Sequence, residues 1–104
     1  MIALKEILEE LNVIQSMGNL ELSIEHAHTD SRKVKVNDLF VAVHGNTVDG
    51  HEYISKAIKN GACAVVCESL PKKIEDGVAY IQVTNSALAA GSCNKVCYGK
   101  PDEK

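Results

Sequence analysis

The sequence predicts a small α/β domain with three layers, in which helices flank a mostly parallel central sheet. Three largely apolar runs, over residues 38–43, 62–67 and 78–83, have the length and composition of buried strands. Their alternation with helical patterns about ten residues long is typical of α/β domains. Residues 39–66 are therefore expected to form a right-handed βαβ unit with two parallel strands. The length of 104 residues suits one compact domain.

The first element expected is a short amphipathic helix. Leu4, Ile7, Leu8 and Leu11 recur at helical spacing, and charged residues stand between them. Residues 20–28 then alternate between apolar and polar side chains, which predicts one strand. The polar residues 30–33 are expected to end that strand as a loop.

A second helix is expected from about residue 50 to residue 60. Asp49 suits its N-cap, and Glu52 follows three residues later, as in a capping box. Asn60 and Gly61 have the character of a C-cap. The buried stripe of this helix is expected to comprise Tyr53, Ile54, Ala57 and Ile58.

The C-terminal part of the chain predicts a surface loop, a strand and a last helix. Residues 71–77 form the loop, and Thr84 or Asn85 can cap a helix that runs towards Cys97. The polar residues 99–104 have the composition of a linker. The domain is therefore expected to occupy residues 1–98, with residues 99–104 as a linker stub to an absent domain.

The charge and the cysteines limit the classes of function. A net charge of −3 argues against a nucleic-acid or anionic-membrane surface, and no long apolar run suggests a signal peptide or a membrane span, so a cytoplasmic location is expected. The cysteines fall in two pairs, 63 with 67 and 93 with 97. Cys63 and Cys67 lie on a predicted strand, where four residues span about 13 Å, too far for a shared zinc ion. Buried free thiols facing one side of the sheet, without a metal, are expected instead.

No catalytic constellation stands out in the sequence. The P-loop pattern G-x-x-x-x-G-K-[ST] fails near Gly99, because position 94 is Asn and Lys100 is followed by Pro101. His26 and His28 share one face of a predicted strand, but the sequence places no third ligand beside them. They are therefore interpreted as solvated or hydrogen-bonded histidines, and no metal site is expected.

Two loops at the ends of predicted strands are the candidate binding elements. Residues 29–32 (TDSR) offer hydroxyls, a carboxylate and a guanidinium on a short turn. Residues 45–50 (GNTVDG) have glycines that permit close backbone approach, and they lead into a helix N-terminus, which favours anions. Open α/β sheets bind ligands at such strand ends. Ordinary turn chemistry is the alternative interpretation of both loops.

The same loops carry a family resemblance. Residues 29–34 (TDSRKV), 37–45 (NDLFVAVHG) and 49–54 (DGHEYI) resemble the N-terminal domain of the Mur ligases, whose usual form is D-[ST]-R-x-[VI]-x-x-G-D-L-F-V-A-[LV]-x-G-x-x-x-D-G-H-x-[FY]-I. The similarity covers roughly residues 22 to 101. Asn37 replaces a usual glycine, which asparagine tolerates because it can adopt a positive φ. The D-S-R form is most similar to the member that adds the third residue of the peptidoglycan stem peptide.

The resemblance implies a three-domain parent enzyme, an ATP-dependent carbon–nitrogen ligase. Its first domain binds UDP-N-acetylmuramoyl-L-Ala-D-Glu, and its central and C-terminal domains, linked in cis, bind ATP with Mg²⁺ and the incoming diamino acid. This fragment is expected to be inactive alone, with no catalytic residue and no cofactor, and to position the UDP end of the substrate. Carried over residue by residue, the UDP-muramoyl contacts are Thr29, Ser31, Asn46, Thr47 and Val48, with Arg32 as a structural or phosphate-facing neighbour.

Two other functions remain open from the sequence. The first domain of the ligase that adds D-Ala-D-Ala has a similar pattern. A free-standing nucleotide-sugar-binding module without a catalytic partner is the alternative from another class. A GTNGKT-like loop directly downstream of residue 104 would exclude that second alternative.

Overall fold

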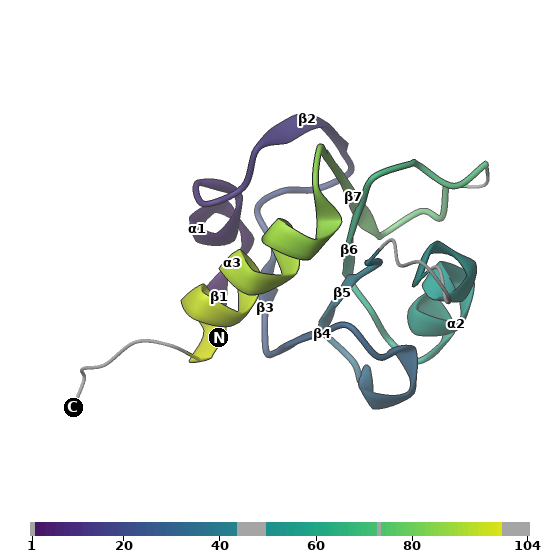
Figure 1. The fold of residues 1–104 in the computed structure, drawn as a ribbon. Helices are drawn as coiled ribbons and strands as arrows, with labels where there is room; N and C mark the ends of the chain where they lie inside the picture. The colour runs from purple at the N-terminus through teal and green to yellow at the C-terminus, as the bar shows by residue number, and fades with distance from the viewer. Residues whose placement is uncertain (1, 44–49, 73, 99–104) are drawn as a thin grey trace.

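The central feature of the fold is a five-stranded sheet with helices on both faces, seen in a computed structural model that describes residues 2–43, 50–72 and 74–98. Figure 1 shows its elements. The predicted α/β class and the three layers are confirmed. In chain order the elements are β1 (Ile2–Ala3), α1 (Leu4–Leu8), β2 (Val13–Met17), β3 (Ser23–Ile24), β4 (Ala27–His28), the 3₁₀ helix η1 (Ser31–Lys33), β5 (Leu39–Val41), the 3₁₀ helix η2 (Gly50–Tyr53), α2 (Ile54–Lys59), β6 (Ala64–Cys67), β7 (Ala79–Val83) and α3 (Ser86–Tyr98).

The strands of the sheet lie in the order β2-β7-β6-β5-β4. The four strands from β4 to β7 are mutually parallel and follow the chain order, whereas β2 pairs antiparallel with β7 at the far edge. β5 and β6 are adjacent and parallel, as the βαβ prediction requires. β1 and β3 form a separate two-stranded antiparallel sheet.

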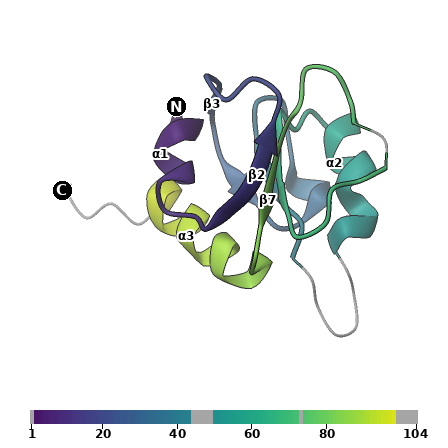
Figure 2. The same ribbon diagram turned by 90° about the horizontal axis from the view of Figure 1, so that it is seen from above.

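Helices cover the two faces of the sheet unequally. α1 and α3 lie on one face and α2 lies on the other, as Figure 2 shows from above. The side chains of β6 alternate between the two faces of the sheet. Ala64 and Val66 pack on the face covered by α1 and α3, whereas Val65 and Cys67 pack on the face covered by α2. All four residues of β6 are buried, which explains why its sequence is a continuous apolar run rather than an alternating one.

Capping residues end or begin the helices close to where the sequence predicts. Asn85 caps α3, because its Oδ1 accepts a hydrogen bond from the Leu88 N–H at 3.1 Å. The first residue of that helix, Ser86, is also tied to Glu68, whose carboxylate accepts from both its N–H and its hydroxyl at 2.8 Å. α2 ends at Asn60, and Gly61 follows with a φ of +120°. These observations confirm Asn85 as a cap and the end of the second helix.

The turn before β5 packs closely against the end of α2. Asn37 has a φ of +71°, which confirms that this asparagine occupies a position that favours glycine. Its N–H donates to the Gly61 carbonyl at 3.1 Å. A Cβ on Gly61 would lie 2.6 Å from both the N and the Cα of Val36, so no side chain fits there. This contact joins the entrance of β5 to the entrance of β6.

In the N-terminal third, one strand prediction is wrong and one strand is not predicted. Residues 20–28 do not form one strand, because β3 pairs with β1 in the small sheet and β4 pairs with β5 in the large one. The edge strand β2 was not predicted, because its first four residues are exposed and include Gln15 and Ser16, so no apolar pattern marks it. Its pairing with β7 includes a side-chain hydrogen bond from Gln15 to Gln82 at 2.9 Å.

The second helix and the cysteines also differ in detail from expectation. The segment begins as η2 and becomes α-helical only at Ile54, and Tyr53 is 41 % exposed instead of buried. Asp49, the predicted N-cap, lies outside the described residues. Cys63 packs towards α1 and α3 whereas Cys67 packs towards α2, so the two thiols do not share one side of the sheet. Cys63 precedes β6, where strict alternation along the strand no longer holds.

The described part of the chain contains no helix that is suited to cross a membrane. None of its helices has both the length and the apolar character that a bilayer crossing requires.

Candidate functional site

Both predicted binding loops leave the sheet on neighbouring parallel strands. β4 and β5 pair through Ala27 with Leu39 and through His28 with Phe40. Residues 29–33 therefore follow the carboxyl end of β4 at the same edge where the chain leaves β5. This is the arrangement that places ligand-binding loops together in open α/β sheets.

The first of these loops is built around Asp30. Its Oδ1 accepts from the Arg32 N–H at 2.9 Å and so caps η1, and its two oxygens accept from the Arg32 Nε at 3.1 Å and Nη2 at 2.9 Å. The side-chain hydrogen bonds from Arg32, followed by the backbone hydrogen bond, hold the pKa of Asp30 at about 2, below its ordinary value of 3.8. The carboxylate in turn raises the pKa of Arg32. Arg32 thus serves first to fix the turn.

Ser31 lies beneath this turn. It is only 5 % exposed, and its carbonyl accepts a hydrogen bond from the side-chain amide of Asn60 at 2.8 Å. The end of α2 therefore holds η1 in place. Ser31 is a rigidly positioned residue, but its surface available to a ligand is small.

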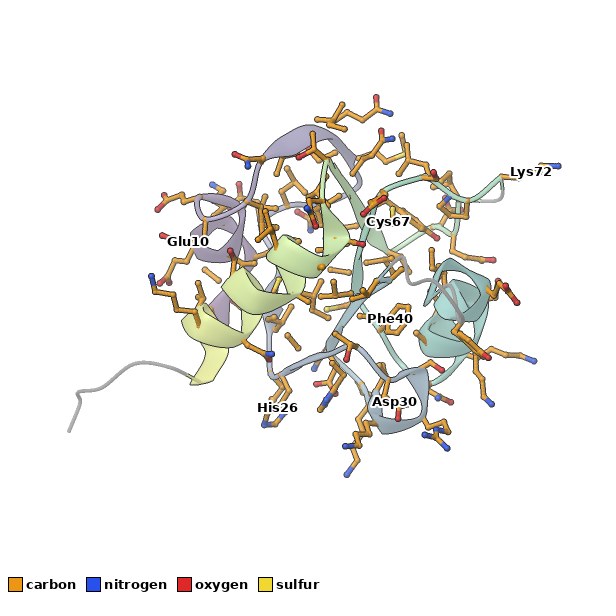
Figure 3. All side chains as sticks on the ribbon, viewed as in Figure 1. Glu10, His26, Asp30, Phe40, Cys67 and Lys72 are labelled. Carbon is orange, nitrogen blue, oxygen red and sulfur yellow. The ribbon has the colours of Figure 1, made fainter. Side chains whose placement is uncertain are left out.

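Thr29 is exposed and lines an open pocket of about 420 Å³ at the β4 edge of the sheet. Figure 3 shows two of the lining residues, His26 and Asp30, on the same border of the molecule. The pocket combines hydroxyl, imidazole, carboxylate, ammonium and amide groups, so it suits a polar ligand. Its lining comprises His26, Ala27, His28, Thr29, Asp30, Lys33 and Asn94.

The second predicted loop follows β5. Asn46, Thr47 and Val48 lie outside the described residues, so their position relative to Thr29 and Ser31 stays a prediction. On the far side of that gap, η2 precedes α2, which is a helix of only six residues.

A cluster that the sequence did not reveal lies beside Thr29. Asp38, at the start of β5, is 2 % exposed and has its Oδ1 3.7 Å from His26 Nδ1 and its Oδ2 3.3 Å from His28 Nε2. The same Oδ2 accepts from the Lys35 N–H at 2.9 Å. The two imidazole centroids are 6.0 Å apart. Ten residues separate His28 from Asp38, and only the parallel register of β4 with β5 brings them together.

The cysteines whose side chains are described are free thiols. These are Cys63, Cys67 and Cys93. Burial raises the pKa of Cys67 to about 11 and also raises the pKa of Cys63. Such thiols are poor nucleophiles, because the thiolate is the reactive form.

Comparison with known proteins yields one family. The sequence profile described as "Mur ligase family, catalytic domain" matches residues 23–99. Curated relatives include UDP-N-acetylmuramoyl-L-alanyl-D-glutamate--2,6-diaminopimelate ligases from Bacteroides fragilis, 43 % identical over 97 % of this chain, and from Parabacteroides distasonis, 40 % identical over 97 %. Each alignment covers 21 % of the relative, so the chain spans about a fifth of the length of these proteins.

Solved structures show the same fold. A crystal structure of MurF from Acinetobacter baumannii superimposes with a TM-score of 0.75 over 91 % of this chain and 20 % of its own, at 21 % identity. The MurF ligase from Thermotoga maritima in complex with ADP superimposes with a TM-score of 0.52, over 60 % of this chain and 14 % of its own, at 32 % identity.

Proposed function

The chain belongs to the Mur ligase family, and we propose from this that it is the UDP-sugar-binding domain of an ATP-dependent ligase that adds a diamino acid to the peptidoglycan stem peptide. The substrate of that ligase would be UDP-N-acetylmuramoyl-L-Ala-D-Glu. ATP and Mg²⁺ would be bound by domains that follow this one in the same protein. The observation that carries the proposal is the 43 % identity, over almost the whole chain, to a ligase named for that reaction.

The local geometry is compatible with a positioning role. Thr29 and Ser31 lie on a turn that is fixed at both ends, by Asp30 and Arg32 on one side and by Asn60 on the other. A rigid turn holds a distant part of a substrate without loss of conformational entropy on binding. The uridine diphosphate would lie against this turn and against Asn46, Thr47 and Val48 in the loop after β5.

The pairing of Arg32 with Asp30 indicates which groups would bind the diphosphate. Its guanidinium is already engaged by Asp30 through two hydrogen bonds, so it is not the main partner of a diphosphate. Backbone N–H groups and hydroxyls would then make most of the contacts. This explains how a domain with a net charge of −3 can hold an anionic ligand.

The chemical role of the domain is to fix one end of a long substrate. When the UDP end is held, the D-glutamate carboxylate can reach the site where it is phosphorylated and then attacked by the amine of the diamino acid. Such remote contacts bind the ground state and the transition state alike, and they lower KM more than they raise kcat.

The second candidate is the ligase that adds D-Ala-D-Ala. The A. baumannii structures that share this fold include one named a D-alanyl-D-alanyl ligase, but that likeness has 21 % identity and shows the fold alone. The curated relatives at 36–43 % identity carry the name of the diaminopimelate-adding enzyme. The first candidate therefore has the stronger support.

The test is kinetic and uses the full-length ligase that contains this domain. Ser31→Ala removes one hydroxyl, and the loss of one neutral hydrogen bond, about 0.5–1.5 kcal/mol, should raise KM for the UDP substrate about two- to twelvefold with little change in kcat. Ser55→Ala, on the exposed side of α2, is the matched control and should leave KM unchanged. Thermal unfolding of both variants separates a binding defect from a folding defect. An unchanged KM in a folded Ser31→Ala enzyme would refute the assignment of Ser31.

A further inference from the structure

We propose that His26, His28 and Asp38 form a binding site for a divalent metal ion such as Zn²⁺. One ligand atom from each residue lies within 4.8 Å of the others. Two imidazole nitrogens and a carboxylate oxygen are a donor set that zinc, cobalt, nickel and copper accept readily. The inference concerns this edge of the sheet alone and does not depend on the proposed ligase function.

The distances are close to those of a coordinated ion. Ligands at about 2.0–2.2 Å from a tetrahedral zinc ion are about 3.3–3.6 Å apart. Asp38 Oδ2 lies 3.3 Å from His28 Nε2, and the other carboxylate oxygen, Oδ1, lies 3.7 Å from His26 Nδ1. The three ligand atoms, which lie within 4.8 Å of one another, would have to approach more closely around an ion, and His26, whose side chain is 56 % exposed, is the least enclosed of the three.

The burial of Asp38 provides an independent reason for a cation. Its side chain is 3 % exposed, and a buried carboxylate needs charge compensation as well as hydrogen bonds. Within the described residues, the side chains at ion-pair distance from this carboxylate are the two imidazoles, and no lysine or arginine side chain is among them. A divalent ion bound by both histidines would compensate the charge directly.

The surroundings of the carboxylate orient it towards the histidines. The Lys35 N–H donates to Oδ2 at 2.9 Å and restricts the rotation of the carboxyl group. Hydrogen bonds of this kind to metal ligands hold the ligand in the geometry that the ion requires. The strand register brings the histidines close to Asp38, because His28 on β4 lies beside Phe40 on β5 and the two strands run parallel.

Three protein ligands leave at least one coordination position for water or another ligand. His26 and His28 also line the open pocket of about 420 Å³ that contains Thr29, so that position would face solvent or a molecule in this pocket. Sites with three protein ligands and one exchangeable position differ in this respect from closed four-ligand structural sites. The ion would therefore be accessible from the surface.

Calorimetry with the 104-residue chain tests the proposal. ZnCl₂ should bind with one ion per chain, whereas MgCl₂ should show no binding, because nitrogen donors disfavour magnesium. His26→Ala and His28→Ala should each weaken zinc binding at least tenfold, since even the loss of a residue that only orients a ligand costs about 10–100-fold. Glu25→Gln, an exposed neighbour outside the cluster, is the matched control and should bind zinc like the parent chain.

Cobalt absorption identifies the ligands separately. Cys63 lies nearby, with its N–H donating to the Asp38 carbonyl at 2.9 Å, so a thiolate ligand has to be distinguished. A Co²⁺ complex of the proposed set should show visible d–d bands without thiolate-to-metal charge transfer. The proposal is overturned if zinc does not bind, if both histidine variants keep full affinity while folded, or if charge-transfer bands appear and vanish in Cys63→Ser.

Discussion

At the centre of the sheet, β6 consists of four residues that are all buried, whereas β4 at the edge has two residues and leads directly into a polar turn. The apolar side chains of β6 are covered by α1 and α3 on one face and by α2 on the other. Around β4, His26, Thr29 and Lys33 are exposed and line a pocket.

This difference separates what stabilises the fold from what can recognise a ligand. Central strands have both faces covered, so their residues are selected for volume and apolar character. An edge strand has one side without a neighbour, and its side chains can carry charge and hydrogen-bonding groups without disturbing the core. The exposed polar residues around β4 should therefore tolerate substitution far better than the buried residues of the central strands.

The largest expected effect is at the centre. Phe40 on β5 is fully buried and points into the space between the sheet and α2 (Figure 3). Phe40→Ala should lower the free energy of unfolding by about 3–5 kcal/mol, because it removes apolar contacts and leaves a cavity. Ile14→Ala on the edge strand β2, where the side chain is 56 % exposed, should cost no more than about 0.5 kcal/mol. Urea unfolding followed by circular dichroism measures both, and equal losses would contradict the contrast between centre and edge.

A smaller effect should distinguish a packed turn from an open one. Gly61→Ala places a methyl group 2.6 Å from backbone atoms of Val36 at a φ of +120°, so it should cost about 3 kcal/mol or more. Gly77 also has a positive φ, +83°, but a Cβ there meets nothing within 4 Å. Gly77→Ala should cost only about 1–2 kcal/mol, the cost of the left-handed backbone itself. Thermal unfolding of the pair would refute the packing argument if Gly77→Ala were the more harmful change.

The smallest effect should appear at the β4 edge. Asp30 should titrate at about 2, and Arg32→Gln should move its pKa up towards 3.8, although the backbone hydrogen bond remains. Because the pKa is lowered in the folded state, the ionised carboxylate favours folding above its ordinary pKa, and this contribution disappears as the pH falls through about 2. The effect on stability should be small, since the pair is exposed.

Carboxyl chemical shifts in an NMR pH titration measure this pKa directly. Lys33→Gln is the matched control, because Lys33 makes the weakest contribution to the lowered pKa, and the substitution keeps the backbone hydrogen bond from the Lys33 N–H to the Asp30 carbonyl at 3.0 Å. A pKa that moved as far with Lys33→Gln as with Arg32→Gln would show that general charge, rather than the paired guanidinium, controls Asp30.

The sequence predicts the elements whose signal is local. β5, β6 and β7 are largely apolar runs, and the positions of Asn37, Gly61 and Asn85 follow from backbone conformation and capping within a few residues. The same locality explains why the sequence points to residues 29–32 as a candidate binding element. Its residues lie close together in the chain and in space.

What the sequence does not predict depends on pairing over long distances. The exposed strand β2 is defined only by its contact with β7, and the break between β3 and β4 follows from their pairing with different partners. The proximity of Asp38 to His26 and His28 depends in the same way on the register of β4 with β5. A search for patterns within a short window of sequence does not detect this register.

The antiparallel strand β2 has a consequence for how the chain is made. Its residues Val13 and Met17 pair with Val83 and Tyr80, so the native partner of β2 is synthesised only after β3, β4, β5 and β6. On a ribosome, the N-terminal segment therefore waits until most of the domain has emerged before it can complete the sheet. Contacts of this sequence separation slow folding, because the loop between them must close first. The edge that has the least apolar sequence signal is thus also the one whose formation depends on a strand far along the chain.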